Sequence, residues 1–182
     1  MSAEHHKKIS KFLSYVLRHR PDEIGLTLDD NGWADIDDLI ERARTTSVGL
    51  THELLYEIVR SNDKQRFAIN DDGKRIRASQ GHSVEVDLAL EPKQPPEVLF
   101  HGTATRFIDA IRQEGLRPMS RQHVHLSPDE ETATKVGQRH GKPVVLRIRS
   151  GDMSRASRIF FLSANGVWLT DLVEPRFVEF PP

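Results

Sequence analysis

The first half of the chain carries apolar patterns of helical spacing, followed by one of strand spacing. Apolar residues at the spacing of one helical face occupy positions 9–17, and Pro21 ends that pattern at Arg20. Two more amphipathic segments follow Asp35 and Thr51, whose side chains can cap a helix. Apolar residues then alternate on both sides of a turn at positions 71–73, which predicts a hairpin. Three helices followed by a hairpin describe a winged-helix module.

The second half begins after a proline-rich run at positions 91–96, the best candidate for a linker. Short apolar segments then predict strands at 98–100, 123–126, 144–148, 166–170 and 177–180, with helices at 107–114 and 129–137. Short strands separated by short helices indicate a mixed lobe. We therefore expect an α+β fold with two lobes, residues 1–90 and 97–182.

Composition narrows the functional classes. The chain has 182 residues, 37% of them hydrophobic, and no cysteine, and its mean hydropathy is −0.52. It contains no apolar run long enough to cross a bilayer and no apolar N-terminal stretch for export, so we expect a cytoplasmic protein without a membrane partner. The lack of cysteine excludes thiol nucleophiles and cysteine-bound metals. Glycine-rich loops for dinucleotides or nucleoside triphosphates, and the serine-hydrolase elbow, are also missing.

Net charge argues against nucleic-acid binding through bulk electrostatics. The formal net charge is −1, whereas domains that bind nucleic acid in that way are usually strongly basic. Any contact with nucleic acid should therefore be local.

One such local candidate is Arg18-His19-Arg20, placed where the first helix must stop. Two guanidinium groups beside an imidazole suit phosphate chemistry, since arginine grips phosphate oxygens in pairs and histidine moves protons near neutrality. Taken alone, such a motif more often compensates a helix dipole than forms a site.

Further candidates lie in the second half. His101-Gly102-Thr103 follows the apolar run at 98–100 and is expected at a strand end, either gripping a small ligand or forming a turn. In the segment 121–127, strand alternation points His123 and His125 to one face. Two such histidines could bind a metal, but no carboxylate has ligand spacing, so a polar ligand-binding face is favoured.

Eight motifs, read in order, resemble the RNA 2′-phosphotransferase family over nearly the whole chain. They are Leu17-Arg18-His19, Gly25-Leu26, Gly32-Trp33-Ala34, Asp63-Lys64-Gln65-Arg66-Phe67, Gln80-Gly81-His82-Ser83, Leu99-Phe100-His101-Gly102-Thr103, Arg121-Gln122-His123-Val124-His125-Leu126-Ser127 and Asn165-Gly166-Val167-Trp168-Leu169. The resemblance implies a winged-helix, RNA-binding lobe joined to an ADP-ribosyltransferase-like, NAD-binding lobe.

The resemblance also implies the reaction. An internal 2′-phosphate of RNA, such as the mark left at a tRNA splice junction, is transferred to NAD, which is consumed as a co-substrate. The phosphate first displaces nicotinamide to give an ADP-ribosylated RNA. The ribose 2″-hydroxyl then attacks the phosphorus, which releases 2′-OH RNA and ADP-ribose 1″,2″-cyclic phosphate. No metal is expected, and the protein is expected to be a monomer.

Residue roles follow from the same resemblance. Arg18, Arg66 and Arg121 match the family's essential arginines, and His19 matches its histidine. The residues expected to line the NAD pocket are His101, Gly102, Thr103, His125 and Ser127. His82 is expected to face the RNA phosphate.

Two other readings stay open from the sequence. One is an ADP-ribosyltransferase that acts on terminal phosphates of nucleic acids or on protein and stops after the first step. The other is a regulator without catalytic activity, in which a winged helix binds nucleic acid and the second lobe senses NAD. A helix that reads DNA bases should present cationic and amide side chains, whereas the third expected helix is mostly apolar with two glutamates. The sequence therefore gives little support to the regulator.

Overall fold

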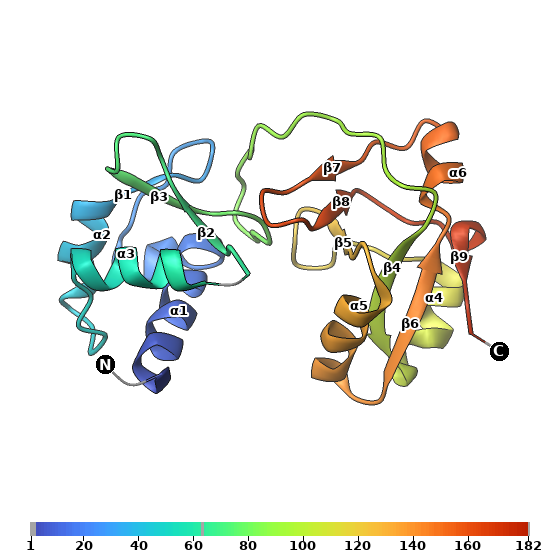
Figure 1. Cartoon of the computed structure of the whole chain (residues 1–182), viewed down its shortest axis with the longest axis horizontal. Coiled ribbons are helices and arrows are strands. Elements are labelled where there is room, and N and C mark those ends of the chain that lie inside the picture. The colour runs from blue at the N-terminus through green and yellow to red at the C-terminus, as the bar shows by residue number, and fades with distance from the viewer. Residues whose placement is uncertain (1–2, 63, 182) are drawn as a thin grey trace. The chain divides into compact units, whose positions relative to one another are not determined.

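A computed structural model describes residues 3–62 and 64–181 and divides the chain into two compact units, Met1–Ala89 (unit 1) and Leu90–Pro182 (unit 2) (Figure 1). Both units combine helices with small antiparallel sheets, so the predicted α+β class is confirmed. Asp63, the first residue of one quoted motif, lies outside the described residues.

Unit 1 begins with helix α1 (Ala3–Arg18), whose apolar stripe faces the core of the unit. Ile9, Leu13 and Leu17 are fully buried, as the helical spacing predicted. Pro21 stops the helix and opens a short 3-10 turn, η1 (Pro21–Ile24). Arg18 is therefore the last helical residue, and His19 follows the helix directly.

The predicted caps start the next two helices. The carboxylate of Asp35 accepts a hydrogen bond from the backbone N–H of Asp38 at the start of α2 (Ile36–Ala43). The hydroxyl of Thr51 accepts one from Leu54 at the start of α3 (His52–Ser61). Each bond satisfies one N–H group that the first helical turn leaves without a partner.

The predicted hairpin consists of β2 (Phe67–Ile69) and β3 (Arg75–Ala78), which pair antiparallel. A short strand that the sequence pattern did not indicate, β1 (Ala34–Asp35), pairs with the other edge of β3 and gives the order β1-β3-β2. Ile76 and Ala78 are fully buried beneath this sheet. The sheet therefore shares one core with the three helices.

Unit 2 contains two three-stranded antiparallel sheets. One sheet has the order β4-β6-β9, from β4 (Leu99–Ala104), β6 (Pro143–Ile148) and β9 (Val178–Glu179). The other has the order β5-β8-β7, from β5 (Val124–Leu126), β8 (Trp168–Thr170) and β7 (Phe161–Leu162). Backbone hydrogen bonds between Phe100 and Ser127 link β4 to the segment after β5. This link brings the two sheets together beside His101.

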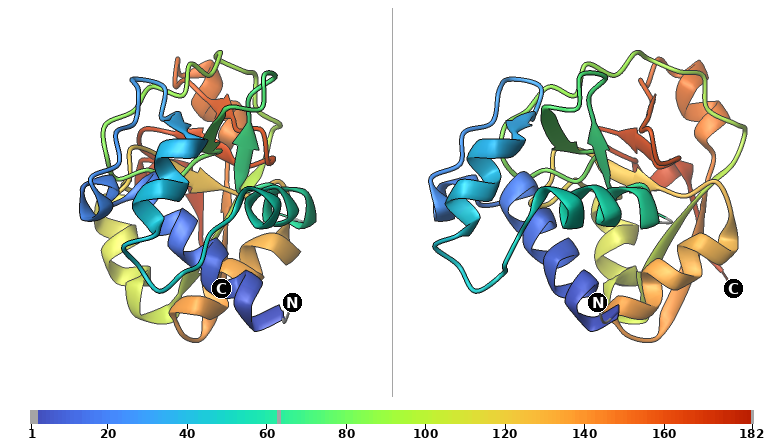
Figure 2. Two further views of the ribbon diagram at one scale, coloured as in Figure 1. Left: turned by 90° about the vertical axis from the view of Figure 1, so that its left-hand side faces the viewer. Right: turned by 60° about the vertical axis from the view of Figure 1, so that its left-hand side comes forward.

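Three α-helices and three 3-10 turns complete unit 2. The helices are α4 (Ile108–Glu114), α5 (Glu130–Gly137) and α6 (Ser150–Arg155), and the turns are η2 (Thr105–Phe107), η3 (Gln138–His140) and η4 (Pro175–Phe177). The views of Figures 1 and 2 show α4 and α5 on opposite sides of the β4-β6 pair. The apolar core lies on the face of this sheet that carries Leu99, Leu146 and Ile148.

The expectation that His101-Gly102-Thr103 follows a strand is wrong, because β4 runs through the motif to Ala104. Gly102 pairs with Val145 of β6, so it belongs to the sheet and not to a turn. Its small size serves packing: a Cβ added there would lie 1.7 Å from the carbonyl oxygen of Ala133 in α5. Glycine thus allows the helix to lie directly on the strand.

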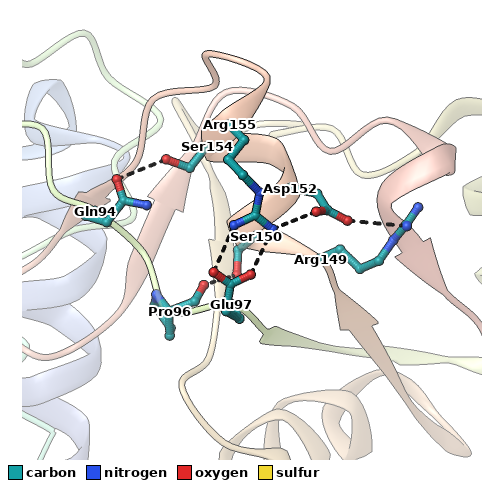
Figure 3. Close-up of polar contacts among 8 residues, drawn as sticks. All are labelled: Gln94, Pro96, Glu97, Arg149, Ser150, Asp152, Ser154 and Arg155. Atoms are coloured by element: carbon teal, nitrogen blue, oxygen red, sulfur yellow. Dashed lines mark hydrogen bonds and ion pairs between the residues drawn. The ribbon is translucent and has the colours of Figure 1, made fainter.

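Helix α6 and strand β7 were not predicted, and their contacts come from distant segments. Figure 3 shows the guanidinium of Arg155 in α6 gripping the carboxylate of Glu97 through two bonds of 2.9 Å each. Ser150 donates to the carbonyl oxygen of Pro96 at 2.7 Å, and the N–H of Lys93 donates to the carbonyl oxygen of Phe160 before β7. The proline-rich run expected as a linker therefore bonds to unit 2.

Among the described residues, no helix is long and apolar enough to span a membrane.

We expect the Gly102→Ala substitution to destabilise unit 2 by about 3 kcal/mol or more, because the added methyl group meets the backbone of α5. Each unit contains one tryptophan, so fluorescence of Trp168 in a Trp33→Phe background reports urea unfolding of unit 2 alone. A matched control is Gly166→Ala, where an added Cβ meets nothing within 4 Å and only the positive φ of 78° is unfavourable, at a cost of about 1 kcal/mol. Equal destabilisation by the two substitutions would contradict the packing argument.

Candidate functional site

The candidate residues fall into two groups, one in each unit. Arg18, His19, Arg66 and His82 belong to unit 1, whereas Arg121, His101, Gly102, Thr103, His125 and Ser127 belong to unit 2. The geometry of each group is described separately below.

Arg18 is joined to the hairpin through the backbone of Arg66. One terminal nitrogen of Arg18 donates to the carbonyl oxygen of Arg66 at 3.3 Å. The same carbonyl accepts the N–H of Ser79 at 2.9 Å, and the guanidinium of Arg18 lies 6.0 Å from the ring centre of Phe67. A side-chain hydrogen bond thereby links Arg18 to the backbone of a residue 48 positions away in the chain.

His19 is oriented by the loop that follows the hairpin. Its Nδ1 lies 2.9 Å from the hydroxyl oxygen of Ser83. The backbone N–H of Ser83 donates in turn to the carbonyl oxygen of Arg18 at 2.9 Å, which satisfies an acceptor at the end of α1. Gly81 lies in this loop with φ of 84°, a value that favours glycine. The Gln80-Gly81-His82-Ser83 motif therefore fixes the ring that follows α1.

His82, from the same loop, is buried with 2% of its surface exposed. Neither ring nitrogen has a hydrogen-bond partner within the described structure. Burial, and to a smaller extent the positive charges of Arg18, His19 and Arg77, lowers the pKa of His82 to about 4. His82 is thus a neutral imidazole close to Arg18, His19 and Arg77. Its expected contact with an RNA phosphate stays a prediction.

In unit 2, His101 lies on β4 beside the edge of β5. Its Nδ1 lies 3.1 Å from the carbonyl oxygen of His125, and a carbonyl only accepts, so Nδ1 carries the proton. Burial lowers the pKa of His101. The ring is therefore neutral near pH 7 and keeps its lone pair on Nε2.

His125 has the opposite tautomer. A terminal nitrogen of Arg121 lies 3.1 Å from Nδ1 of His125, and a guanidinium only donates, so Nδ1 accepts and Nε2 carries the proton. Burial lowers the pKa of Arg121, and the charge of Arg139 lowers it further, yet arginine stays charged at any working pH. Neighbouring imidazoles thus offer an acceptor on His101 and a donor on His125.

The remaining candidates in unit 2 flank these histidines. Thr103 is buried on β4, on the same face as His101. Gly102 on the opposite face admits α5, and Ser127 exchanges two backbone hydrogen bonds with Phe100. All six candidates of unit 2 therefore belong to β4, to β5 or to segments next to β5.

His123, which was expected to share a polar ligand-binding face with His125, makes other contacts. His123 lies outside β5, packs edge-on against Phe161 with ring centres 5.7 Å apart, and approaches Asp171 at 3.7 Å. Within residues 3–62 and 64–181, no cluster of three metal-ligating side chains is present.

Two residues beside the site were not assigned a role from the sequence. Arg77 stacks over Trp33 at 4.5 Å and donates to the carbonyl oxygens of Asn31 and Leu88, each at 3.4 Å. The alternation of arginine with apolar residues along 75–78 could have indicated it. Ser83 was quoted within a motif, but only the structure shows its contact with His19.

We expect the free energy of unfolding of unit 1 to decrease as the pH falls from about 6.5 to about 4. An ordinary histidine has a pKa of about 6.5, whereas that of folded His82 is about 4, so the unfolded chain binds more protons in this range. The contribution reaches about 3 kcal/mol and is fully present above pH 6.5.

The measurement is urea unfolding followed by Trp33 fluorescence in a Trp168→Phe background at several pH values. The slope with pH should decrease in His82→Leu and persist in His5→Gln, which alters a less buried histidine of the same unit. An unchanged slope in His82→Leu would show that His82 does not titrate in this way.

Comparisons with known proteins agree with the resemblance read from the motifs. Residues 4–172 match the family model described as "RNA 2'-phosphotransferase, Tpt1 / KptA family". The chain is 56% identical over 174 residues to a protein of Flavobacterium johnsoniae named "Probable RNA 2'-phosphotransferase", with 96% of each chain covered.

Two further relatives carry the same name. The protein of Pectobacterium carotovorum subsp. carotovorum is 56% identical over 183 residues, which cover 100% of this chain and 98% of the relative. That of Hahella chejuensis is 57% identical over 173 residues, which cover 95% and 93%. Because the family model and these relatives span nearly its whole length, the chain belongs to the RNA 2′-phosphotransferase, Tpt1 / KptA family.

Proposed function

We propose that this RNA 2′-phosphotransferase uses NAD as the phosphate acceptor and works in two steps. In the first, an oxygen of the RNA 2′-phosphate attacks the anomeric carbon of the nicotinamide ribose. The bond from that carbon to nitrogen breaks, and nicotinamide leaves with the electron pair as a neutral molecule. In the second, the ribose 2″-hydroxyl attacks the phosphorus, and the bond from phosphorus to the RNA 2′-oxygen breaks. The RNA oxygen takes up a proton, and ADP-ribose 1″,2″-cyclic phosphate is released.

The two units take different parts in this proposal. Residues 1–90 form a winged-helix lobe that binds RNA, and residues 97–182 form an ADP-ribosyltransferase-like lobe that binds NAD. Three helices with an antiparallel three-stranded sheet support the first assignment. Two small antiparallel sheets that meet beside His101 support the second.

The observation that carries the proposal is the cationic cluster at the end of α1. Arg18 and Arg66 are joined through a backbone carbonyl, and Ser83 orients His19 beside them. Guanidinium groups held in place before the reaction stabilise the charge that builds on phosphoryl oxygens in the second step, by about 3 to 4 kcal/mol per donor. His19 moves a proton to or from the ribose oxygens, a role worth roughly 10²- to 10⁴-fold in rate.

In unit 2, Arg121 is the third arginine to which the resemblance gives a catalytic role, and the segments beside it bind NAD. The neutral His101 can accept a hydrogen bond from a ribose hydroxyl through Nε2, and His125 can donate one. Gly102, Thr103 and Ser127 complete the pocket. No base is needed to create the first nucleophile, because the phosphate is already an anion. The strand β8 accordingly needs no carboxylate and has none.

Further parts of the proposal concern the setting of the reaction. His82 supports the RNA phosphate site, no metal takes part, and the enzyme acts as a monomer in the cytoplasm, where RNA and NAD occur together. A 2′-phosphate at a tRNA splice junction is the substrate that the family resemblance suggests.

Incubation of the protein with NAD and an RNA that carries one internal 2′-phosphate tests this function. We expect loss of the phosphate, release of nicotinamide and formation of the cyclic phosphate in equal amounts. A stable ADP-ribosylated RNA without cyclic phosphate would instead identify an ADP-ribosyltransferase that stops after the first step.

Replacing Arg66 or His19 by alanine should slow the second step more than the first, by roughly 10²-fold. ADP-ribosylated RNA should therefore accumulate, and its amount is followed in single-turnover reactions by gel electrophoresis. The control is Arg44→Ala, which removes an exposed arginine paired with Glu41 at the end of α2. Accumulation of unmodified RNA in both site variants would show that the assigned roles are wrong.

A further inference from the structure

A groove runs along α1 in unit 1 and contains the candidate residues His19 and Arg66 at one end. Its volume is about 610 Å³. Helix α1 forms one wall, and the other comes from the end of α3 and the turn that leads to β2. The groove thus extends well beyond the cationic cluster of Arg18, His19 and Arg66 at the end of α1.

Several basic side chains line this groove, although unit 1 as a whole has more acidic than basic residues. Lys7, Lys11, Lys64 and Arg66 line it, and no acidic residue does so within the part of the chain that the structure describes. Residues 1–90, in contrast, carry 13 basic and 16 acidic side chains. Several of these acids bind cations elsewhere, as Asp38 does with Arg42 at 2.7 Å. The described residues that line the groove are therefore basic or neutral, whereas the unit as a whole is acidic.

The lining residues of α1 follow the helical repeat. Lys7, Lys11 and Tyr15 are each four positions apart on α1, so they form one row with neighbouring Cβ atoms about 5–6 Å apart. His19 directly follows the helix and continues this spacing, since its N–H donates to the carbonyl oxygen of Tyr15. Twelve residues at a rise of about 1.5 Å give the row a length of roughly 18 Å. A row of that length can contact several successive nucleotides.

The opposite wall is held by a tight turn. The backbone N–H groups of Lys64 and Gln65 donate to the side chain and carbonyl oxygen of Asn62 at 3.1 Å and 2.8 Å. Ser79 fixes the far end of the turn through the carbonyl oxygens of Gln65 and Arg66. These hydrogen bonds position the backbone of Lys64 and Arg66, which line the groove together with α1.

We propose that this groove binds the single-stranded RNA that flanks the 2′-phosphate. Lysines along the walls contact successive backbone phosphates, and the ring of Tyr15, which is 43% exposed, stacks on a base. A positively charged groove with an aromatic side chain is the combination that binds single strands without reading their sequence. The inference rests on the proposed function, because it takes the end near His19 and Arg66 as the place of the reacting phosphate.

Binding of a fluorescent hexanucleotide RNA without a 2′-phosphate, measured by anisotropy between about 50 and 200 mM salt, tests the groove without any turnover. The double variant Lys7→Gln/Lys11→Gln should bind about 10-fold more weakly at low salt. The slope of log affinity against log salt should become shallower by about 1.4, because two phosphate contacts to a single strand are lost.

The matched control is Lys8→Gln/Lys74→Gln, which removes the same charge outside the groove. Lys8 lies on α1 but donates to the carbonyl oxygen of Ser47 at 3.2 Å, and Lys74 follows the hairpin turn and is exposed. The control should keep the wild-type salt slope. An unchanged slope in Lys7→Gln/Lys11→Gln, or an equal change in both double variants, overturns the proposal. Equally tight binding of poly-glutamate does so too.

Tyr15→Leu separates stacking from charge. This variant should lower affinity by about 5-fold or more with the salt slope unchanged, because it removes the aromatic ring and the hydroxyl that donates to Glu23 at 3.5 Å but no positive charge. Binding of the hexanucleotide is independent of NAD, so a failure of the phosphotransfer assay and a failure of the groove are told apart. Wild-type affinity in both Tyr15→Leu and Lys7→Gln/Lys11→Gln would remove the groove from the account while leaving the reaction intact.

Discussion

The carbonyl groups at the end of α1 and the start of β2 are the acceptors on which the cationic cluster of unit 1 depends. Like charges repel, so groups that accept hydrogen bonds help to hold neighbouring basic side chains in place. The carbonyl of Arg66 accepts from Arg18, and the carbonyl of Arg18 accepts from Ser83. These backbone hydrogen bonds hold the side chain of Arg18 and the loop of Ser83 in place before a ligand binds, and donors that are preorganised in this way can stabilise phosphoryl transfer.

In unit 2, hydrogen-bond partners likewise determine which ring nitrogen of each of two histidines carries the proton. A carbonyl forces the proton of His101 onto Nδ1, and a guanidinium forces the proton of His125 onto Nε2. Burial lowers the pKa of His101 and favours its neutral form. These contacts leave an acceptor on His101 and a donor on His125, and neither contact involves a carboxylate. This arrangement suits the proposed reaction, because its nucleophile, the RNA phosphate, is already an anion and needs no carboxylate base.

Local signals in the sequence were sufficient for most elements, and distant contacts determined the rest. Asp35 and Thr51 cap the helices expected after them, because a cap acts within one turn. The continuation of β4 through Gly102 depends on pairing with β6 and on packing by α5, so the glycine suggested a turn instead. Likewise, Arg18 meets the backbone of residues 66 and 83, a proximity that no local pattern encodes. For those positions only the resemblance to a family indicated the site.

The division of labour between arginine and lysine follows from the geometry of their head groups. Arginine presents a planar fork that fixes an anion in one orientation, whereas lysine is a mobile point charge that accepts many. Arginines surround the end of α1, where one phosphate has to be aligned for reaction. Three of the eight lysines of the chain line the groove instead, where a backbone of variable sequence has to be held without a fixed register. Strict alignment at one phosphate combined with tolerance along the rest of the strand lets an enzyme recognise a chemical mark in many sequence contexts.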